Sequence, residues 1–266
     1  MARKWQLELG PAYENSTNAL VLFARRPNGG RVVLKLPFLY EHNQHEADAL
    51  EHYRGQGAVR LEAIDHETGA LLLEHVAPGT PLGACTADSE IVAIGCKLLR
   101  RLWRQVTEPH PFRSSIALAE TWALELSSGL ERHADHFRAD FATDALAASK
   151  LLCAPSVNEV LVNHDLHLEN VLAAEREPWL LIDPKPLVGD PALDAGQFAL
   201  QCLSRETRTM AAHDLATKLS RDLAVDRERL IGWAMSCALR NALTALDAGH
   251  GAHEQIELAR QFHQAF

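Results

Sequence analysis

The sequence predicts an α+β protein whose first third is a small antiparallel sheet and whose remainder is mostly helical. Three observations carry this prediction. Short apolar segments separated by turn residues fill residues 4–76. Beyond residue 82, apolar residues recur at helical spacing over long stretches. Within that helical part lie two further short apolar runs, and each is followed by an aspartate, Asp165 or Asp183.

Composition is that of an ordinary globular chain. The 266 residues suffice for one large domain or two small ones, and 47% are hydrophobic while 23% are charged. No apolar run approaches the roughly 18–20 residues of a membrane span, and the N-terminus lacks an apolar signal segment. Five scattered cysteines without a Cys-x-x-Cys pair predict reduced, mostly buried thiols and a cytoplasmic location.

The net charge of −9 is unevenly distributed. The first 75 residues hold 8 basic and 10 acidic residues, a net charge of −2, which leaves −7 for the rest. An acidic chain argues against a nucleic-acid partner, and a membrane partner is not expected either. The acidic part could attract a small cationic substrate, although solubility alone would explain it equally well. The oligomeric state is not indicated.

Five strands and one helix are predicted before residue 77. Apolar, β-branched runs separated by Pro-Asn-Gly-Gly and Glu-Thr-Gly turns indicate antiparallel strands at residues 5–9, 19–25, 31–36, 58–64 and 70–76. Residues 42–54 indicate a helix, because Ala47, Leu50 and Tyr53 fall on one face. Pro and Gly at residues 77–81 mark a boundary between two parts of the chain.

The remainder is predicted to be helical with one interruption. A stripe of apolar residues predicts a helix at 88–106, whose start Thr86 or Asp88 could cap. Trp103 and Trp122 are expected to be core or helix-packing residues rather than platforms for a ligand. The other predicted helices span residues 115–132, 143–152, 192–203, 205–223, 227–248 and 252–266.

The stretch that interrupts the predicted helices, residues 159–183, holds the candidate catalytic and metal-binding residues. Residues 159–162 and 179–182 read as strands, followed by Asp165 and Asp183, and Asn170 lies five positions after Asp165. This Asp-x4-Asn spacing with a later strand-terminal Asp suits phosphoryl transfer, where one Asp accepts a hydroxyl proton and the other two residues bind a metal. Magnesium prefers oxygen ligands of this kind. The absence of a Gly-x4-Gly-Lys-Ser/Thr sequence disfavours a P-loop protein.

The stretch His-Asp-Leu-His-x-x-Asn followed by Ile-Asp-Pro resembles the catalytic and metal loops of the aminoglycoside phosphotransferase group. Its continuation, residues 182–194, is most similar to the branch of streptomycin 6-kinases and hydroxyurea-associated kinases. The resemblance implies a bilobal protein-kinase-like fold. Residues 1–76 would form a nucleotide-binding lobe of five strands and one helix. Residues 77–266 would form a helical lobe with the catalytic loop, the metal loop and the acceptor site.

The same resemblance implies an ATP-dependent small-molecule O-kinase that uses Mg²⁺. Asp165 would be the catalytic base, while Asn170 and Asp183 would bind the metal. Residues 32–35 resemble the kinase strand that carries the nucleotide lysine, so Lys35 would hold phosphates. Glu46, within the predicted helix, would pair with Lys35.

Supporting and substrate-facing roles follow from the resemblance as well. His167 and Asp194 would support the catalytic loop, and Asp190 could lie near the substrate. Glu74 and Val76 lie at the expected hinge, where backbone groups would bind the adenine edge.

Two features depart from the family pattern. Residues 14–18 occupy the position of a phosphate-covering loop but contain no glycine, so Ser16 and Thr17 are the candidates there. The family usually reads His-Gly-Asp where this chain has Asn163, His164 and Asp165. Both departures leave open a catalytically silent, kinase-like binding protein.

Other interpretations also remain at this point. His164, Asp165 and His167 could ligate zinc in a hydrolase, although no further ligands are evident. Within the kinase interpretation, streptomycin phosphorylated at its 6-hydroxyl is the expected acceptor, which would make the protein an antibiotic-resistance enzyme. Another aminoglycoside, a sugar alcohol, an amino alcohol or hydroxyurea are the alternatives.

Overall fold

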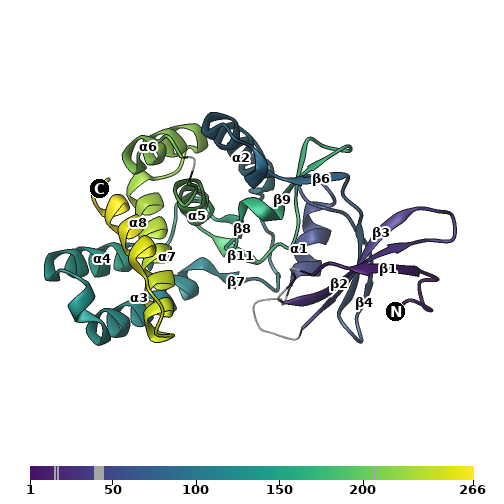
Figure 1. The fold of residues 1–266 in the computed structure, drawn as a ribbon, viewed down its shortest axis with the longest axis horizontal. Coiled ribbons are helices and arrows are strands. Elements are labelled where there is room, and N and C mark those ends of the chain that lie inside the picture. The colour runs from purple at the N-terminus through teal and green to yellow at the C-terminus, as the bar shows by residue number, and fades with distance from the viewer. Residues whose placement is uncertain (15, 17, 39–44, 207) are drawn as a thin grey trace. The chain divides into compact units, whose positions relative to one another are not determined.

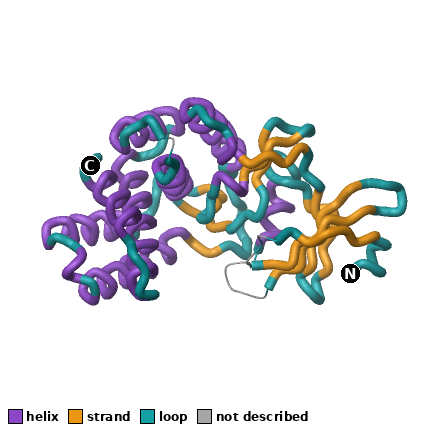
Figure 2. Tube along the Cα trace, in the orientation of Figure 1, coloured by secondary structure: helices purple, strands orange, loops and turns teal. Residues whose placement is uncertain are grey.

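The computed structural model describes residues 1–14, 16, 18–38, 45–206 and 208–266. The chain divides into two compact units, which are described separately below. The first unit comprises Met1–Leu82 and Glu169–Pro186, and the second comprises Gly83–Leu168 and Leu187–Phe266. Strands predominate in the first unit and helices in the second (Figure 2).

The first unit is built on a five-stranded antiparallel sheet, as the sequence predicted. The strand order is β1-β2-β3-β5-β4. The strands are β1 (Glu8–Ala12), β2 (Ala19–Arg25), β3 (Arg31–Pro37), β4 (Leu61–Asp65) and β5 (Ala70–Glu74) (Figure 1). The first strand begins three residues later than expected, because backbone hydrogen bonds from Trp5 to Met1 and from Leu7 to Ala2 fold residues 1–7 into turns.

Helix α1 (Glu46–Tyr53) accompanies this sheet. Its buried side is formed by Glu46, Ala49, Leu50 and Tyr53, at the i, i+3, i+4 and i+7 spacing of a helix face. The sequence predicted Ala47 on this face, and Ala49 occupies it instead. The buried face of the helix therefore begins with an acidic residue, Glu46. The predicted helical residues 42–44 lie outside the described part of the chain.

A second sheet joins the two stretches of the first unit. Strands β6 (Pro78–Pro81), β9 (Val171–Ala174) and β10 (Trp179–Leu181) pair antiparallel in the order β10-β9-β6. The Val59 amide also donates to the Leu181 carbonyl at 3.0 Å. Because of these pairings, residues 169–186 belong to the same unit as residues 1–82. The sequence had placed them in the lobe of residues 77–266.

Arg176 also links residues 169–186 to the N-terminal stretch of the first unit through hydrogen bonds. Its guanidinium donates to both carboxylate oxygens of Glu74, each at 2.8 Å, and to the carbonyls of Gly55 and Ala58. A bidentate arginine–carboxylate pair with added carbonyl acceptors is among the stronger polar contacts in proteins. One side chain therefore joins β5, the segment before β4 and the segment before β10.

The second unit is mostly helical. Its helices are α2 (Asp88–Leu102), α3 (Ser115–Arg132), α4 (Ala139–Leu152), α5 (Ala192–Leu203), α6 (Ala212–Leu223), α7 (Arg227–Asp247) and α8 (His253–His263). Strands β7 (Arg113–Ser114), β8 (Val160–Asn163) and β11 (Pro186–Gly189) form a small sheet in the order β7-β11-β8. The long helix α7 packs against α3, α4, α5, α6 and α8 and places Trp233 in the core.

Several details of the helix prediction were wrong. The helix expected at 88–106 ends at Leu102, and the helix expected to begin at residue 143 begins at Ala139. Asp88 does not cap α2 with its side chain, because its carboxylate instead accepts hydrogen bonds from the amide and hydroxyl of Thr209. The helix expected to begin at residue 205 begins at Ala212. The Arg205 guanidinium instead donates to the carbonyls of Gly83 and Cys85, at 3.0 and 2.6 Å.

All five cysteines lie in the described part of the chain and are free thiols; Cys96 and Cys202 are buried, and the other three are partly buried. Among the described residues, we find no helix with the length and apolar character needed to span a membrane.

Candidate functional site

The first unit gathers four charged side chains around the end of β10. The Lys35 ammonium, on β3, donates to Glu46 Oε1 at 2.8 Å and to Asp183 Oδ1 at 2.5 Å. Lys185 donates to the other oxygen of Asp183, Oδ2, at 3.2 Å. The pairing of Lys35 with Glu46 was predicted from the sequence. The two contacts of Asp183 with lysines were not.

Burial makes these contacts strong. Lys35, Glu46 and Lys185 are each less than a tenth exposed. Burial lowers the pKa of Lys35, but Glu46 and Asp183 more than offset this and hold it above the ordinary value. Burial likewise raises the pKa of Asp183, and the ammonium groups of Lys35 and Lys185 reverse that shift and bring it below the ordinary value. Lys35 is therefore a cation and Asp183 an anion at neutral pH.

Asn170 is tied to this group through the backbone. It ends a short 3₁₀ helix, η4 (Leu168–Asn170), and its carbonyl accepts the Ile182 amide at 2.8 Å, next to Asp183. Asp183 itself has a positive φ of 51°. Non-glycine residues adopt this conformation infrequently, and it is enriched at functional sites. A carboxylate and an amide oxygen on adjoining strands are donors that fit Mg²⁺, which keeps several water ligands.

The loop after β8, in the second unit, carries Asp165. The His167 imidazole lies 2.7 Å from Asp165 through Nε2 and Oδ1, and both side chains are partly exposed. His167 therefore contacts the predicted catalytic carboxylate, and its supporting role remains a prediction. Gln197, on α5, brackets the loop because its amide nitrogen donates to the His164 carbonyl and its amide oxygen accepts from the Leu166 amide at 3.5 Å.

Asp194 anchors the start of the same loop. Its Oδ1 accepts the Asn163 amide at 2.8 Å, and its Oδ2 accepts the Trp103 indole N–H at 2.9 Å. Burial raises the pKa of Asp194 to about 8. The contacts at Asn163 and His164 use their backbone atoms. The unusual side chains at these two positions therefore leave the anchoring hydrogen bonds in place.

The carboxylate of Asp190 accepts hydrogen bonds from other residues of the second unit. It is 3% exposed and accepts hydrogen bonds from the Arg229 guanidinium at 2.6 Å, the Trp233 indole at 3.1 Å and the Ala192 amide at 3.0 Å. The structure thus brings Asp190 to the packing of α5 against α7. A direct contact with substrate remains a prediction.

The predicted hinge and phosphate loop are placed only in part. The Glu74 carboxylate binds Arg176 and the Arg60 amide, so its side chain fixes the end of β5, while Val76 lies two residues farther along the chain. The Ser16 hydroxyl donates to the Ala19 carbonyl at 2.7 Å. Thr17 lies outside the described residues.

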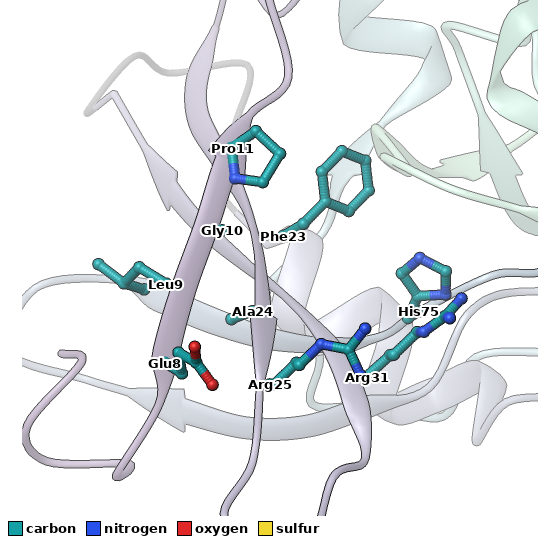
Figure 3. A pocket seen from close by; sticks show the side chains of 9 residues that line it. All are labelled: Glu8, Leu9, Gly10, Pro11, Phe23, Ala24, Arg25, Arg31 and His75. Carbon is teal, nitrogen blue, oxygen red and sulfur yellow. The ribbon is translucent and has the colours of Figure 1, made fainter.

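A hollow of about 280 Å³ lies on the first sheet (Figure 3). Its lining includes Phe23, Arg25, Arg31 and His75, and the Phe23 and His75 rings meet edge to face at 5.8 Å. Arg31, Val33 and Lys35 lie at every second position of β3 and therefore on one face. Phe23 pairs with Val33 and Arg25 pairs with Arg31, so their side chains share that face. Because side chains alternate along strands, the hollow lies on the face of the sheet that carries Lys35.

Sequence reasoning missed three residues of this arrangement. Lys185 could have been noticed as a lysine between two prolines directly after the predicted metal-binding aspartate. Gln197 gave no local signal, since it lies 31 residues from the loop that it brackets. Trp103 was assigned to helix packing, and its indole in fact also donates to Asp194.

Several solved structures share this fold. A macrolide 2'-phosphotransferase from Brachybacterium faecium has a TM-score of 0.64 and 17% identity, covering 98% of this chain and 95% of that one. A choline/ethanolamine kinase family protein from Mesorhizobium loti also has a TM-score of 0.64, with 16% identity over 96% and 87% of the two chains. These similarities show a protein-kinase-like fold.

Fold and sequence together define a phosphotransferase that acts on hydroxyl groups. The chain belongs to the family described as aminoglycoside/hydroxyurea antibiotic resistance kinase, which matches residues 4–249. It is 33% identical to a streptomycin 6-kinase of Streptomyces griseus, over 96% of this chain and 84% of the relative. It is 35% identical to a hydroxyurea phosphotransferase of Kitasatospora aureofaciens, over 96% and 74%.

Proposed function

We propose that the protein transfers the γ-phosphoryl group of ATP, as a magnesium complex, to the 6-hydroxyl of streptomycin. The observation that carries this proposal is the buried Lys35–Glu46 pair joined to Asp183, a group that suits polyphosphate and metal binding. Streptomycin is proposed as the acceptor because the chain is 33% identical in sequence to streptomycin 6-kinases from each of two Streptomyces species.

In this mechanism Lys35 binds the nucleotide phosphates, and Glu46 holds the lysine in place. Asn170 and Asp183 hold Mg²⁺, which would neutralise charge on the transferred phosphoryl group. A strand rises about 3.3 Å per residue, so the backbone of Val33 lies roughly 7 Å along β3 from that of Lys35. Phe23 pairs with Val33. We therefore assign the adenine end of the nucleotide to the Phe23–His75 side of the face, near Glu74 and Val76.

Asp165 orients the acceptor hydroxyl and takes its proton, and His167 positions the Asp165 carboxylate from 2.7 Å. Asp194 and Gln197 hold the loop backbone, so that little reorganisation is needed when substrates bind.

The test is ADP release with Mg·ATP across streptomycin, other aminoglycosides, amino alcohols, sugars and hydroxyurea. We expect turnover with streptomycin, and a fall of roughly 10²- to 10⁴-fold in kcat for Asp165→Asn, the usual scale of general-base catalysis. Glu169→Gln, an exposed acid on the same loop, is the matched control and should retain activity. Undiminished turnover in Asp165→Asn would refute the mechanism.

Hydroxyurea is the second candidate acceptor, favoured by the 35% identity to a hydroxyurea phosphotransferase. Turnover with hydroxyurea and none with streptomycin would select it. Nucleotide binding without turnover on any acceptor of the panel would favour a catalytically silent protein.

A further inference from the structure

Lys185 is a buried cation to which the mechanism above assigns no role. It is 4% exposed and lies two residues after Asp183, with its Nζ 3.2 Å from Asp183 Oδ2. Lysine is rarely buried to this extent unless it is paired. Because Lys35 contacts Oδ1, each oxygen of one carboxylate faces its own ammonium group.

The charges of the four side chains balance only when Lys185 is counted. With both carboxyl groups ionised, Lys35 and Lys185 contribute two positive charges, while Glu46 and Asp183 contribute two negative ones. Burial raises the pKa of Glu46, and the Lys35 ammonium opposes that shift and favours the ionised form. Without Lys185 the group would carry a net negative charge beside the ammonium predicted to bind phosphates. At such separations and in a partly buried setting, one charge changes the affinity for a polyanion substantially.

The backbone holds Lys185 in position in advance. It lies between Pro184 and Pro186, and all three residues are buried. Proline fixes its own φ and restricts the residue before it to extended conformations. The lysine therefore loses little further backbone freedom when its ammonium is held at Asp183. Packing alone would be served as well by an apolar side chain, since buried ion pairs are seldom required for stability.

We propose that Lys185 is a positioning residue that neutralises Asp183, so that the site can hold a nucleoside polyphosphate before a metal ion is bound. This inference rests on the proposed nucleotide-binding function. When Mg²⁺ is present, its charge makes that of Lys185 largely redundant for affinity. Lys185 therefore sets the balance between metal-free and metal-dependent nucleotide binding.

The experiment compares dissociation constants for ATP, measured by calorimetry in EDTA and in saturating Mg²⁺. We expect Lys185→Met to weaken metal-free binding roughly tenfold or more, while binding with Mg²⁺ changes less than about threefold. Lys185→Arg keeps the charge and should resemble the wild type. Lys97→Met removes an exposed lysine on α2 and is the matched control. Lys185→Gln replaces the methionine variant if that protein does not fold.

The outcomes separate the inference from the function on which it rests. An unchanged ratio of the two dissociation constants in Lys185→Met or Lys185→Gln would overturn the role of Lys185, and so would metal-free binding too weak to detect in the wild type. Equal weakening in both buffers, with a lowered melting temperature, would show a purely structural residue. A wild-type protein that binds no nucleotide in either buffer would overturn the proposed function as well.

Discussion

Asp194 couples the ionisation of one residue to the stability of the fold. Burial raises the pKa of this carboxyl group to about 8, from an ordinary value of 3.8. Between these values the folded protein keeps a proton that the unfolded chain has released. The free energy of unfolding therefore falls as pH rises through this window, and the contribution is fully present only below the ordinary value.

We expect the wild type to lose stability between about pH 4 and pH 8 more steeply than Asp194→Asn, whose amide does not titrate. The asparagine variant keeps the side-chain volume and should cost about 1–3 kcal/mol at low pH, because one of its two donors, from Asn163 or Trp103, loses its acceptor. Urea denaturation at a series of pH values measures both. Parallel profiles for the two proteins would contradict the raised pKa.

At the same scale, the sequence predicted those site residues that belong to a local pattern. Lys35 and Glu46 could be paired because residues 32–35 resemble the kinase strand that carries the nucleotide lysine, and Glu46 lies in the predicted helix that follows. The contact is present at 2.8 Å. Lys185 and Gln197 could not be found in this way. Their partners are set by how separate elements pack, and short-range periodicity carries no information about that packing.

At the scale of elements, the packing of α5 against α7 depends on Gly196. A Cβ atom at this position would lie 2.6 Å from the Leu230 carbonyl oxygen and 2.9 Å from the Ala234 amide nitrogen. Backbone atoms in a helix cannot move aside as a side chain can. The same helix carries Asp194 and Gln197, which hold the predicted catalytic loop.

Gly196→Ala should therefore destabilise the protein by about 1–3 kcal/mol through overpacking, a cost that outweighs the gain of up to about 1 kcal/mol in helix propensity. We also expect kcat to fall, because moving α5 displaces the loop anchors. Thermal denaturation and ADP release test this together. Gly251→Ala is the control, since a Cβ there meets nothing within 4 Å. Wild-type stability in Gly196→Ala would show that the helices can separate freely.

Elements whose apolar positions follow one clear period were predicted well, and a strand that depends on a distant partner was missed. The helix at 115–132 and the strand at 19–25 match α3 and β2 because many apolar positions agree on one period. The strand β6 was missed because two of its four residues are proline, which reads as a boundary. Its strand character depends on pairing with β9, some 90 residues later in the chain.

At the scale of the whole molecule, the acidic charge bears on how an acceptor is captured. The net charge of −9, of which −7 falls after residue 75, should attract a cationic acceptor at low ionic strength. Raising the ionic strength from about 0.01 M to about 0.15 M shortens the screening length from roughly 30 Å to roughly 8 Å.

We therefore expect kcat/KM for streptomycin to fall severalfold over this range, while an uncharged acceptor such as a sugar or hydroxyurea shows no such fall. Initial rates at several salt concentrations measure the effect. Equal salt dependence for charged and uncharged acceptors would show that the acidic surface serves solubility alone.

The division of the first unit into two stretches has a consequence for biosynthesis. Residues 1–82 leave the ribosome well before residues 169–186, which supply β9, β10 and Arg176. At a synthesis rate of about 5–20 residues per second, the early stretch waits for roughly 5–20 seconds. During that interval β6 lacks its β9 partner, and Glu74 lacks the guanidinium that later binds both of its oxygens. The N-terminal unit is consequently completed late in translation, although it is begun first.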